Sequence, residues 1–152
     1  MKITKRGEYA LRVLLALASV YDEGRTLNLR EISEEEKLPV KFLEQIMIIL
    51  KKAGLVQSTQ GQHGGYALSI SPKEMTLGKI IRTIEGPLAP IGTRAEIEKR
   101  IQQSGRAAGL YFALLEVRDA VSKILDKKTL ADVYEKSLEL AQSKPQHQMY
   151  YI

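Results

Sequence analysis

The sequence predicts a mostly α-helical protein in which three short helices and one β-hairpin precede a long C-terminal helix. Three observations predict this order. Apolar residues recur at helical spacing over residues 4–22, 29–36 and 40–52. Two short stretches of β-favouring residues then flank the glycine-rich segment 60–65. A heptad-like apolar series finally runs along residues 105–125.

Each early helix carries its own start or stop signal. Residues 22–24, Asp-Glu-Gly, end the first helix. Asn28 with Glu31 three residues later forms a capping-box pattern that opens the second. Pro39 opens the third, because the N–H that proline lacks has no helical partner at that position. Gly54 then closes it.

Residues 55–59 and 66–70 have strand character. Three helices followed by a glycine-rich hairpin is the order of a winged helix-turn-helix, with the hairpin as the wing. Gly61 has two equally weighted interpretations, a simple turn former or a functional wing residue. Gly64 and Gly65 are expected to let the backbone pass close to another group, such as a phosphate.

The second half of the chain is predicted to pair two copies. A short helix over 76–84 is broken by residues 85–87, Glu-Gly-Pro, and a short charged helix is expected at 95–102. The long helix over 105–125 then carries an apolar seam at steps of four and three, namely Leu110, Leu114, Val117, Val121 and Ile124. We interpret this seam as a dimerisation surface. The alternative is that the helix packs only on its own domain.

The domain organisation predicted from these elements has four parts. Residues 1–85 form the winged helix-turn-helix, 86–104 a linker, 105–142 the dimerisation helices, and 143–152 a flexible polar tail. The last helix is expected to start with Thr129 and Asp132 as its cap and to end near Ala141.

Composition narrows the function classes. The formal net charge is +5. The first dozen residues contain one acidic residue, Glu8, and four basic ones, Lys2, Lys5, Arg6 and Arg12. The absence of cysteine excludes disulfides, thiolate zinc sites and a cysteine nucleophile. No apolar run is long enough to span a membrane and no signal peptide is recognised, so we expect a cytoplasmic protein.

An enzyme is the least favoured class. The two histidines, His63 and His147, both fall in predicted loops, and no acid–base pair or phosphate loop is evident. His63 is better interpreted as a phosphate donor at the wing tip.

The third helix carries the residues that would read bases. With Leu43, Ile46 and Leu50 facing the core, the outward positions include Lys41, Glu44 and Gln45. Glutamine pairs with adenine, glutamate accepts from the cytosine amino group, and lysine meets phosphate or guanine. A solvated helix face is the alternative interpretation. The other candidate DNA-binding residues lie on the helices and in the wing: Lys2, Lys5, Arg6, Tyr9, Phe42, Gln60, Gly61, His63, Gly64, Gly65 and Tyr66.

Four segments together resemble one family of bacterial regulators, that of IscR, NsrR and CymR: MKITKRGEYALRVLLALA, FLEQIMIILKKAGLV, GQHGGYAL and TLGKIIRTIEGPLAPI. The resemblance covers nearly the whole chain and is nearest to the cluster-free CymR type, which represses cysteine metabolism. It implies homodimers on near-palindromic operators of double-stranded DNA. It also implies that Glu44 and Gln45 lie at base edges and that the wing lies in the minor groove.

The chain departs from that family at two places. Gln60 stands where the family commonly has an arginine, the residue favoured by a narrow minor groove, so the wing contact is expected to be weaker or different. Thr93 and Ala108 stand where cluster-bearing members have cysteines. A hydroxyl or methyl group cannot replace a thiolate as a cluster ligand, so this departure from the family predicts a regulator without metal or cofactor.

The final residues, Tyr150, Tyr151 and Ile152, resemble tails that dock into cysteine synthase. A free carboxylate behind an apolar residue imitates a substrate amino acid, and backbone nests capture such groups. Tyr151 and Ile152 are therefore candidate partner-binding residues. The alternative is that these aromatic residues pack on the dimer.

The sequence thus predicts a homodimeric, sequence-specific DNA-binding regulator. The family resemblance implies that it represses sulfur and cysteine genes. The alternative from another class is a protein–protein interaction module with a residual winged fold and no operator of its own.

Overall fold

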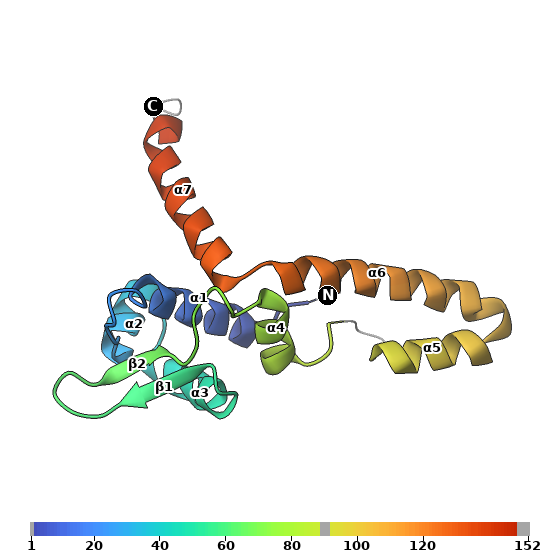
Figure 1. The fold of residues 1–152 in the computed structure, drawn as a ribbon, viewed down its shortest axis with the longest axis horizontal. Coiled ribbons are helices and arrows are strands. Elements are labelled where there is room, and N and C mark those ends of the chain that lie inside the picture. The colour runs from blue at the N-terminus through green and yellow to red at the C-terminus, as the bar shows by residue number, and fades with distance from the viewer. Residues whose placement is uncertain (1, 89–91, 149–152) are drawn as a thin grey trace.

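The computed structural model describes residues 2–88 and 92–148, with side chains up to residue 143. Its elements follow the predicted order (Figure 1): α1 (Lys5–Ser19), α2 (Leu29–Glu36), α3 (Val40–Lys52), β1 (Val56–Thr59), β2 (Gly65–Leu68), α4 (Leu77–Glu85), α5 (Arg94–Gln103), a 3-10 turn (Gly105–Ala107), α6 (Ala108–Lys127) and α7 (Leu130–Gln148). The predicted mostly α fold with an N-terminal winged helix-turn-helix is confirmed.

One apolar core holds the winged domain together. Leu14 of α1, Ile32 of α2 and Leu43 of α3 are fully buried in it. Met75 and Ile80 extend this core to α4, and Leu130 ties the first turn of α7 to it. The two strands pair antiparallel in the register Val56–Leu68 to Thr59–Gly65.

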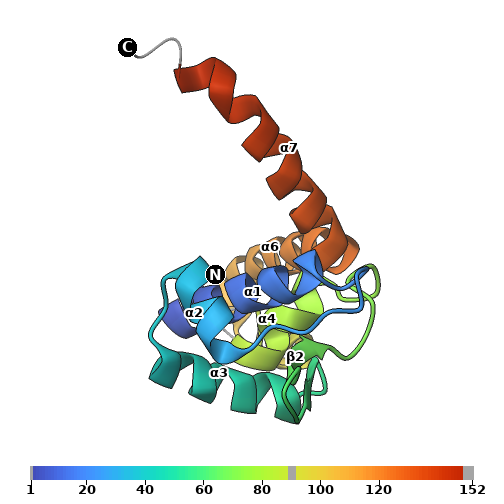
Figure 2. The ribbon, with the colours of Figure 1, turned by 90° about the vertical axis from the view of Figure 1, so that its left-hand side faces the viewer.

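Two elements project from the winged domain. α6 runs sideways with α5 packed along it, and α7 leaves the domain in another direction (Figure 1). Figure 2 shows α3 along one edge of the winged domain and α7 leaving from the opposite side. The α3 edge is therefore free of both projections in this view.

α6 is joined to the winged domain through α4. Arg82 of α4 makes a two-pronged ion pair with Asp126 of α6, with N–O distances of 2.7 and 2.8 Å. A Cβ atom on Gly78 would overlap the Asp126 carboxylate, so the glycine makes room for the pair. The hydrogen bond from Arg82 is the main cause of the lowered pKa of Asp126.

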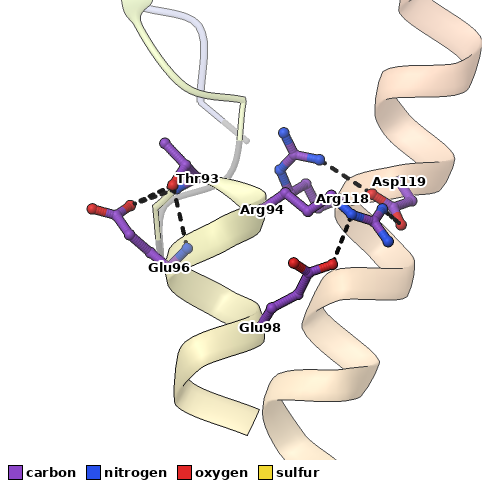
Figure 3. Close-up of polar contacts among 6 residues, drawn as sticks. All are labelled: Thr93, Arg94, Glu96, Glu98, Arg118 and Asp119. Atoms are coloured by element: carbon purple, nitrogen blue, oxygen red, sulfur yellow. Dashed lines mark hydrogen bonds and ion pairs between the residues drawn. The ribbon is translucent and has the colours of Figure 1, made fainter. Parts of the chain in front are cut away.

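α5 occupies the segment predicted as a linker, and it is one residue longer at each end than the expected charged helix. Thr93 and Glu96 form a capping box at its start, and the hydrogen bonds from Thr93 lower the pKa of Glu96 (Figure 3). Ile97 is fully buried. Arg94 donates to Asp119 of α6 at 2.6 Å and to Glu98 at 2.9 Å (Figure 3).

Several helix ends differ from the prediction, among them those of α1 and α7. α1 ends at Ser19 rather than residue 22, because the chain turns there, with the Gly24 N–H bonded to the Tyr21 carbonyl. α7 continues to Gln148, past the predicted end near Ala141, so its helical backbone includes residues 143–148 of the predicted tail. No glycine interrupts residues 130–148, and alanine, leucine, lysine and glutamine favour a helix there.

Candidate nucleic-acid interface

α3 divides its side chains between the core and the surface. Leu43, Ile46, Met47 and Leu50 are buried, whereas Lys41, Glu44, Gln45 and Ile48 are exposed. Ile48 is 66% exposed. The polar groups of Glu44 and Gln45 thus stand on an open helix face with no competing core contact, as reading of base edges requires.

The turn between α2 and α3 is fixed by local bonds. Lys37 takes a left-handed conformation, with φ of 55°, at the end of α2. The Leu38 N–H donates to the Ser33 carbonyl at 3.2 Å, and the Ser33 hydroxyl donates to the Leu38 carbonyl at 2.6 Å. This pair of bonds sets the direction in which α3 leaves the turn.

Tyr9 and Phe42 lie between α1 and α3. Their rings meet edge to face with centroids 5.4 Å apart, and both side chains are partly buried against the core. The Arg12 guanidinium lies 5.8 Å from the Tyr9 ring and pairs with Glu36 of α2 at 2.9 Å. Both aromatic residues were predicted to bind DNA, and the structure gives them a packing role that joins the start of α1 to the first turn of α3.

The start of α1 carries the predicted phosphate-binding residues. Lys2, Lys5 and Arg6 are all exposed. Lys5 lies 3.4 Å from Glu8, a loose pair on the surface. Arg6 donates to the Ile84 carbonyl of α4 at 3.3 Å, which leaves its other N–H groups for a ligand.

The wing is attached to the domain at its base. Tyr66 exchanges two backbone hydrogen bonds with Leu27, at 2.7 and 3.0 Å, and its side chain is partly buried. Gln60, Gly61 and His63 at the tip are exposed. Gly61 has φ of 114°, so the turn itself requires a glycine there.

The close approach expected at Gly64 and Gly65 is internal. A Cβ atom on Gly64 would overlap the Thr59 carbonyl, and one on Gly65 would lie 2.8 Å from the Leu27 backbone. Close contacts within the hairpin account for Gly64 and packing against the Leu27 backbone accounts for Gly65, so the phosphate explanation is not needed for them.

The sequence reasoning overlooked Lys51 in the last turn of α3. It is exposed and donates to the Ser58 hydroxyl of β1 at 2.9 Å, where α3 meets the wing. Its place within an apolar helix gave no signal that it would face the strand.

An exposed third helix, a basic helix start beside it and a wing at its end define a protein of the winged helix-turn-helix transcription regulator class. A profile of the Rrf2 family, described as iron-dependent transcriptional regulators, matches residues 3–136. The chain belongs to this family.

Individual relatives agree with that placement. CymR of Bacillus subtilis is 36% identical over 133 residues, covering 88% of this chain and 89% of its own length. NsrR of Geobacillus kaustophilus is 33% identical over 135 residues, covering 89% and 90%. The structure of CymR, titled the global cysteine regulator of B. subtilis, has a TM-score of 0.71 at 34% identity over 90% of this chain and 98% of that one. IscR of T. potens has a TM-score of 0.67 at 30% identity, covering 90% and 88%.

The residues present do not fit the iron or iron–sulfur centre that the family description implies. The Thr93 hydroxyl is engaged as the N-cap of α5, and Ala108, the first residue of α6, offers only a methyl group. The chain contains no cysteine. Within residues 2–88 and 92–143, no group of three or more histidine, cysteine, aspartate or glutamate side chains could hold a metal ion.

The helices that the structure describes include none long and apolar enough to cross a membrane. The predicted partner-binding residues, Tyr151 and Ile152, lie outside the described part of the chain.

Proposed function

We propose that the protein is a homodimeric, sequence-specific DNA-binding regulator that inserts α3 into the major groove. The observation that carries this proposal is the open face of α3, where Lys41, Glu44 and Gln45 stand exposed. The basic start of α1 adjoins the first turn of this helix through the Tyr9–Phe42 contact, and the wing follows its last turn.

The side chains divide into two kinds of contact. Gln45 and Glu44 carry groups that match base edges, adenine and the cytosine amino group respectively. Lys2, Lys5 and Arg6 are positive and flexible, which suits phosphate binding without sequence preference. Gln60 and His63 at the wing tip are exposed and are proposed to contact the minor groove and phosphates.

The dimer is proposed to form along α6. Leu110, Val117 and Ile124 recur every seven residues and are 60%, 61% and 64% exposed, whereas Leu114 and Val121 are partly exposed beside them. Leu115, on the other side of the helix, is buried within the protomer. Such a continuous apolar stripe is typical of a surface that a second helix covers. Two joined winged domains suit a near-palindromic operator.

Regulation of sulfur and cysteine genes, as a repressor without a cluster, is the finer proposal. Its support is the similarity to CymR, whose structure is titled the global cysteine regulator, together with the missing cysteines. Genomic footprinting of the protein on its host DNA tests it. Enrichment at sulfur-assimilation promoters is expected, and scattered weak sites would instead favour an interaction module without an operator.

Cysteine synthase is the proposed protein partner. The support is the sequence of residues 150–152, Tyr-Tyr-Ile, which resembles tails that dock into this enzyme and makes Tyr151 and Ile152 the proposed binding residues. Calorimetry of a peptide of residues 143–152 against the host enzyme tests this. The peptide with a free carboxylate should bind and compete with amino-acid substrate, while its C-terminal amide should not. Equal behaviour of the two would contradict the proposal.

A further inference from the structure

Glu85, the last residue of α4, contacts the start of α1 although 81 residues separate it from Thr4. Its Oε1 atom accepts from the Thr4 backbone N–H at 2.9 Å and from the Thr4 hydroxyl at 2.6 Å. The same Thr4 hydroxyl is the N-cap of α1 and accepts from the Gly7 N–H at 3.1 Å. Glu85 therefore takes the only proton of that hydroxyl, so that a lone pair faces the helix.

Two residues at this junction are poor choices for the helices that contain them. A negative charge is unfavourable at the C-terminal end of a helix, where Glu85 lies in α4. Glycine is a poor helix former, yet Gly7 lies in the first turn of α1. A Cβ atom on Gly7 would overlap Glu85 Oε1. One contact explains both residues, since the carboxylate needs the space above the glycine and is favourable at the N-terminal end of α1.

The turn that Glu85 holds is the one that carries the basic residues. Lys5 and Arg6 are the first two residues of α1 and directly follow Thr4. Arg6 is held in addition by the neighbouring Ile84 carbonyl at 3.3 Å. The end of α4 thus fixes both the cap of α1 and one of its cationic side chains.

We propose that Glu85 is a positioning residue for DNA binding: it orders the first turn of α1 so that Lys5 and Arg6 meet the phosphate backbone. This inference rests on the proposed function, in which these two residues bind phosphates. It makes α4 part of the DNA-binding machinery without any contact between Glu85 and DNA.

The direction in which DNA affinity changes when Glu85 is removed distinguishes a positioning role from a simple charge effect. Removal of an acidic side chain near a cluster of cations should strengthen binding to a polyanion on charge alone. The proposal requires the opposite, since an unheld first turn loses its preorganised phosphate contacts. Glu85→Ala is therefore expected to weaken binding, whereas the charge-matched control Glu139→Ala, on exposed α7, should not.

The experiment measures binding of the full chain to a fluorescent duplex of arbitrary sequence, about 30 bp long, at several salt concentrations, because phosphate contacts dominate such binding. Glu85→Ala should lower affinity about 3- to 10-fold at low salt and reduce the salt slope by about one to two ions. Glu85→Gln, which keeps one acceptor oxygen, should fall between wild type and Glu85→Ala.

A second pair of variants removes the ambiguity of a simple folding defect. Gly7→Ala should lower both melting temperature and affinity, because its methyl group displaces the Glu85 carboxylate. In the Gly7→Ala/Glu85→Ala double variant the methyl group has room and alanine favours the helix, so melting temperature should recover. Affinity and salt slope should stay low, because the cap is still unheld.

Three results would overturn the inference. The first is that Glu85→Ala binds the duplex as tightly as wild type and Glu139→Ala do. The second is that the double variant regains affinity together with its melting temperature. If Lys5→Ala reduces the salt slope, either of these two results overturns the inference about Glu85 and leaves the proposed function standing. An unchanged slope in Lys5→Ala would overturn the phosphate assignment in the proposed function as well, and the inference with it.

Discussion

Replacement of Val117 by lysine offers a direct test of the dimer proposed along α6. Val117 is the middle member of the series Leu110, Val117 and Ile124, and nothing in its own protomer covers most of it. In a two-fold dimer the substituted position occurs twice, once on each helix. The new ammonium group would have to be desolvated or displaced from the contact.

The expected loss follows from the exposed fraction. Full burial of a valine side chain stabilises by about 1.5–3 kcal/mol. Val117 is 61% exposed in the protomer, so a partner helix can bury the remaining part for about 1–2 kcal/mol. Two copies give about 2–4 kcal/mol, which raises the dimer Kd roughly 30- to 700-fold.

Sedimentation equilibrium over a concentration series measures this Kd. The matched control is Glu116→Lys, which places the same side chain at the adjacent exposed position of α6, outside the seam. Wild type and Glu116→Lys should sediment as dimers where Val117→Lys is largely monomeric, with the three proteins equally helical by circular dichroism. A Val117→Lys dimer as tight as the control, or a monomeric wild type at micromolar concentration, would refute the reasoning.

Three further results are expected. Gln45→Ala should cost about 1–3 kcal/mol of binding free energy on the best operator and relax the preference at one base pair. Lys5→Ala should weaken binding to all sequences alike and reduce the salt slope by about one ion. Competition binding checks both variants, and a loss of only non-specific affinity in both would contradict the assignment of α3 as the helix that reads bases. Anaerobic reconstitution with iron and sulfide should leave the protein colourless, because it has no thiolate ligand, and stoichiometric iron and sulfide would contradict the cluster-free proposal. Arg82 lowers the pKa of Asp126 from its ordinary value of 3.8, so the pair stabilises the fold fully above that pH and less as the pH falls through the lowered pKa. In urea titrations Asp126→Asn should therefore lose up to about 1 kcal/mol of unfolding free energy near pH 7 and progressively less towards pH 2. A difference that does not change with pH would count against the pair.

Local signals made the first three helices predictable. Asn28 and Glu31 form the capping box expected from their spacing, with the Asn28 N–H bonded to the Glu31 carboxylate at 2.8 Å. α2 and α3 have the bounds that the sequence predicted. The open face of α3 followed from the same periodicity, because the buried side of a helix determines which side remains exposed.

Contacts between distant segments were not predictable in the same way. Nothing near Glu85 in the sequence indicates that its carboxylate binds Thr4, the N-cap of the helix that begins at Lys5. The sequence predicts a close approach at Gly64 and Gly65 but not the groups approached, because Thr59 and Leu27 come close to these glycines only in the fold. The sequence predicts an end of the last helix near Ala141, whereas the backbone remains helical to Gln148.

The segment that, by the family resemblance, stands in place of a cysteine-bearing stretch is ordered structure in this chain. Thr93 caps α5, Ile97 is buried, and Arg94 bridges to Asp119. These interactions hold α5 at its first turn and against α6. Thr93→Cys would remove the cap, at a cost of about 0.5–2 kcal/mol, before its thiol found a metal. Recovery of a cluster at this position therefore requires the loss of a helix start as well as the gain of thiolates.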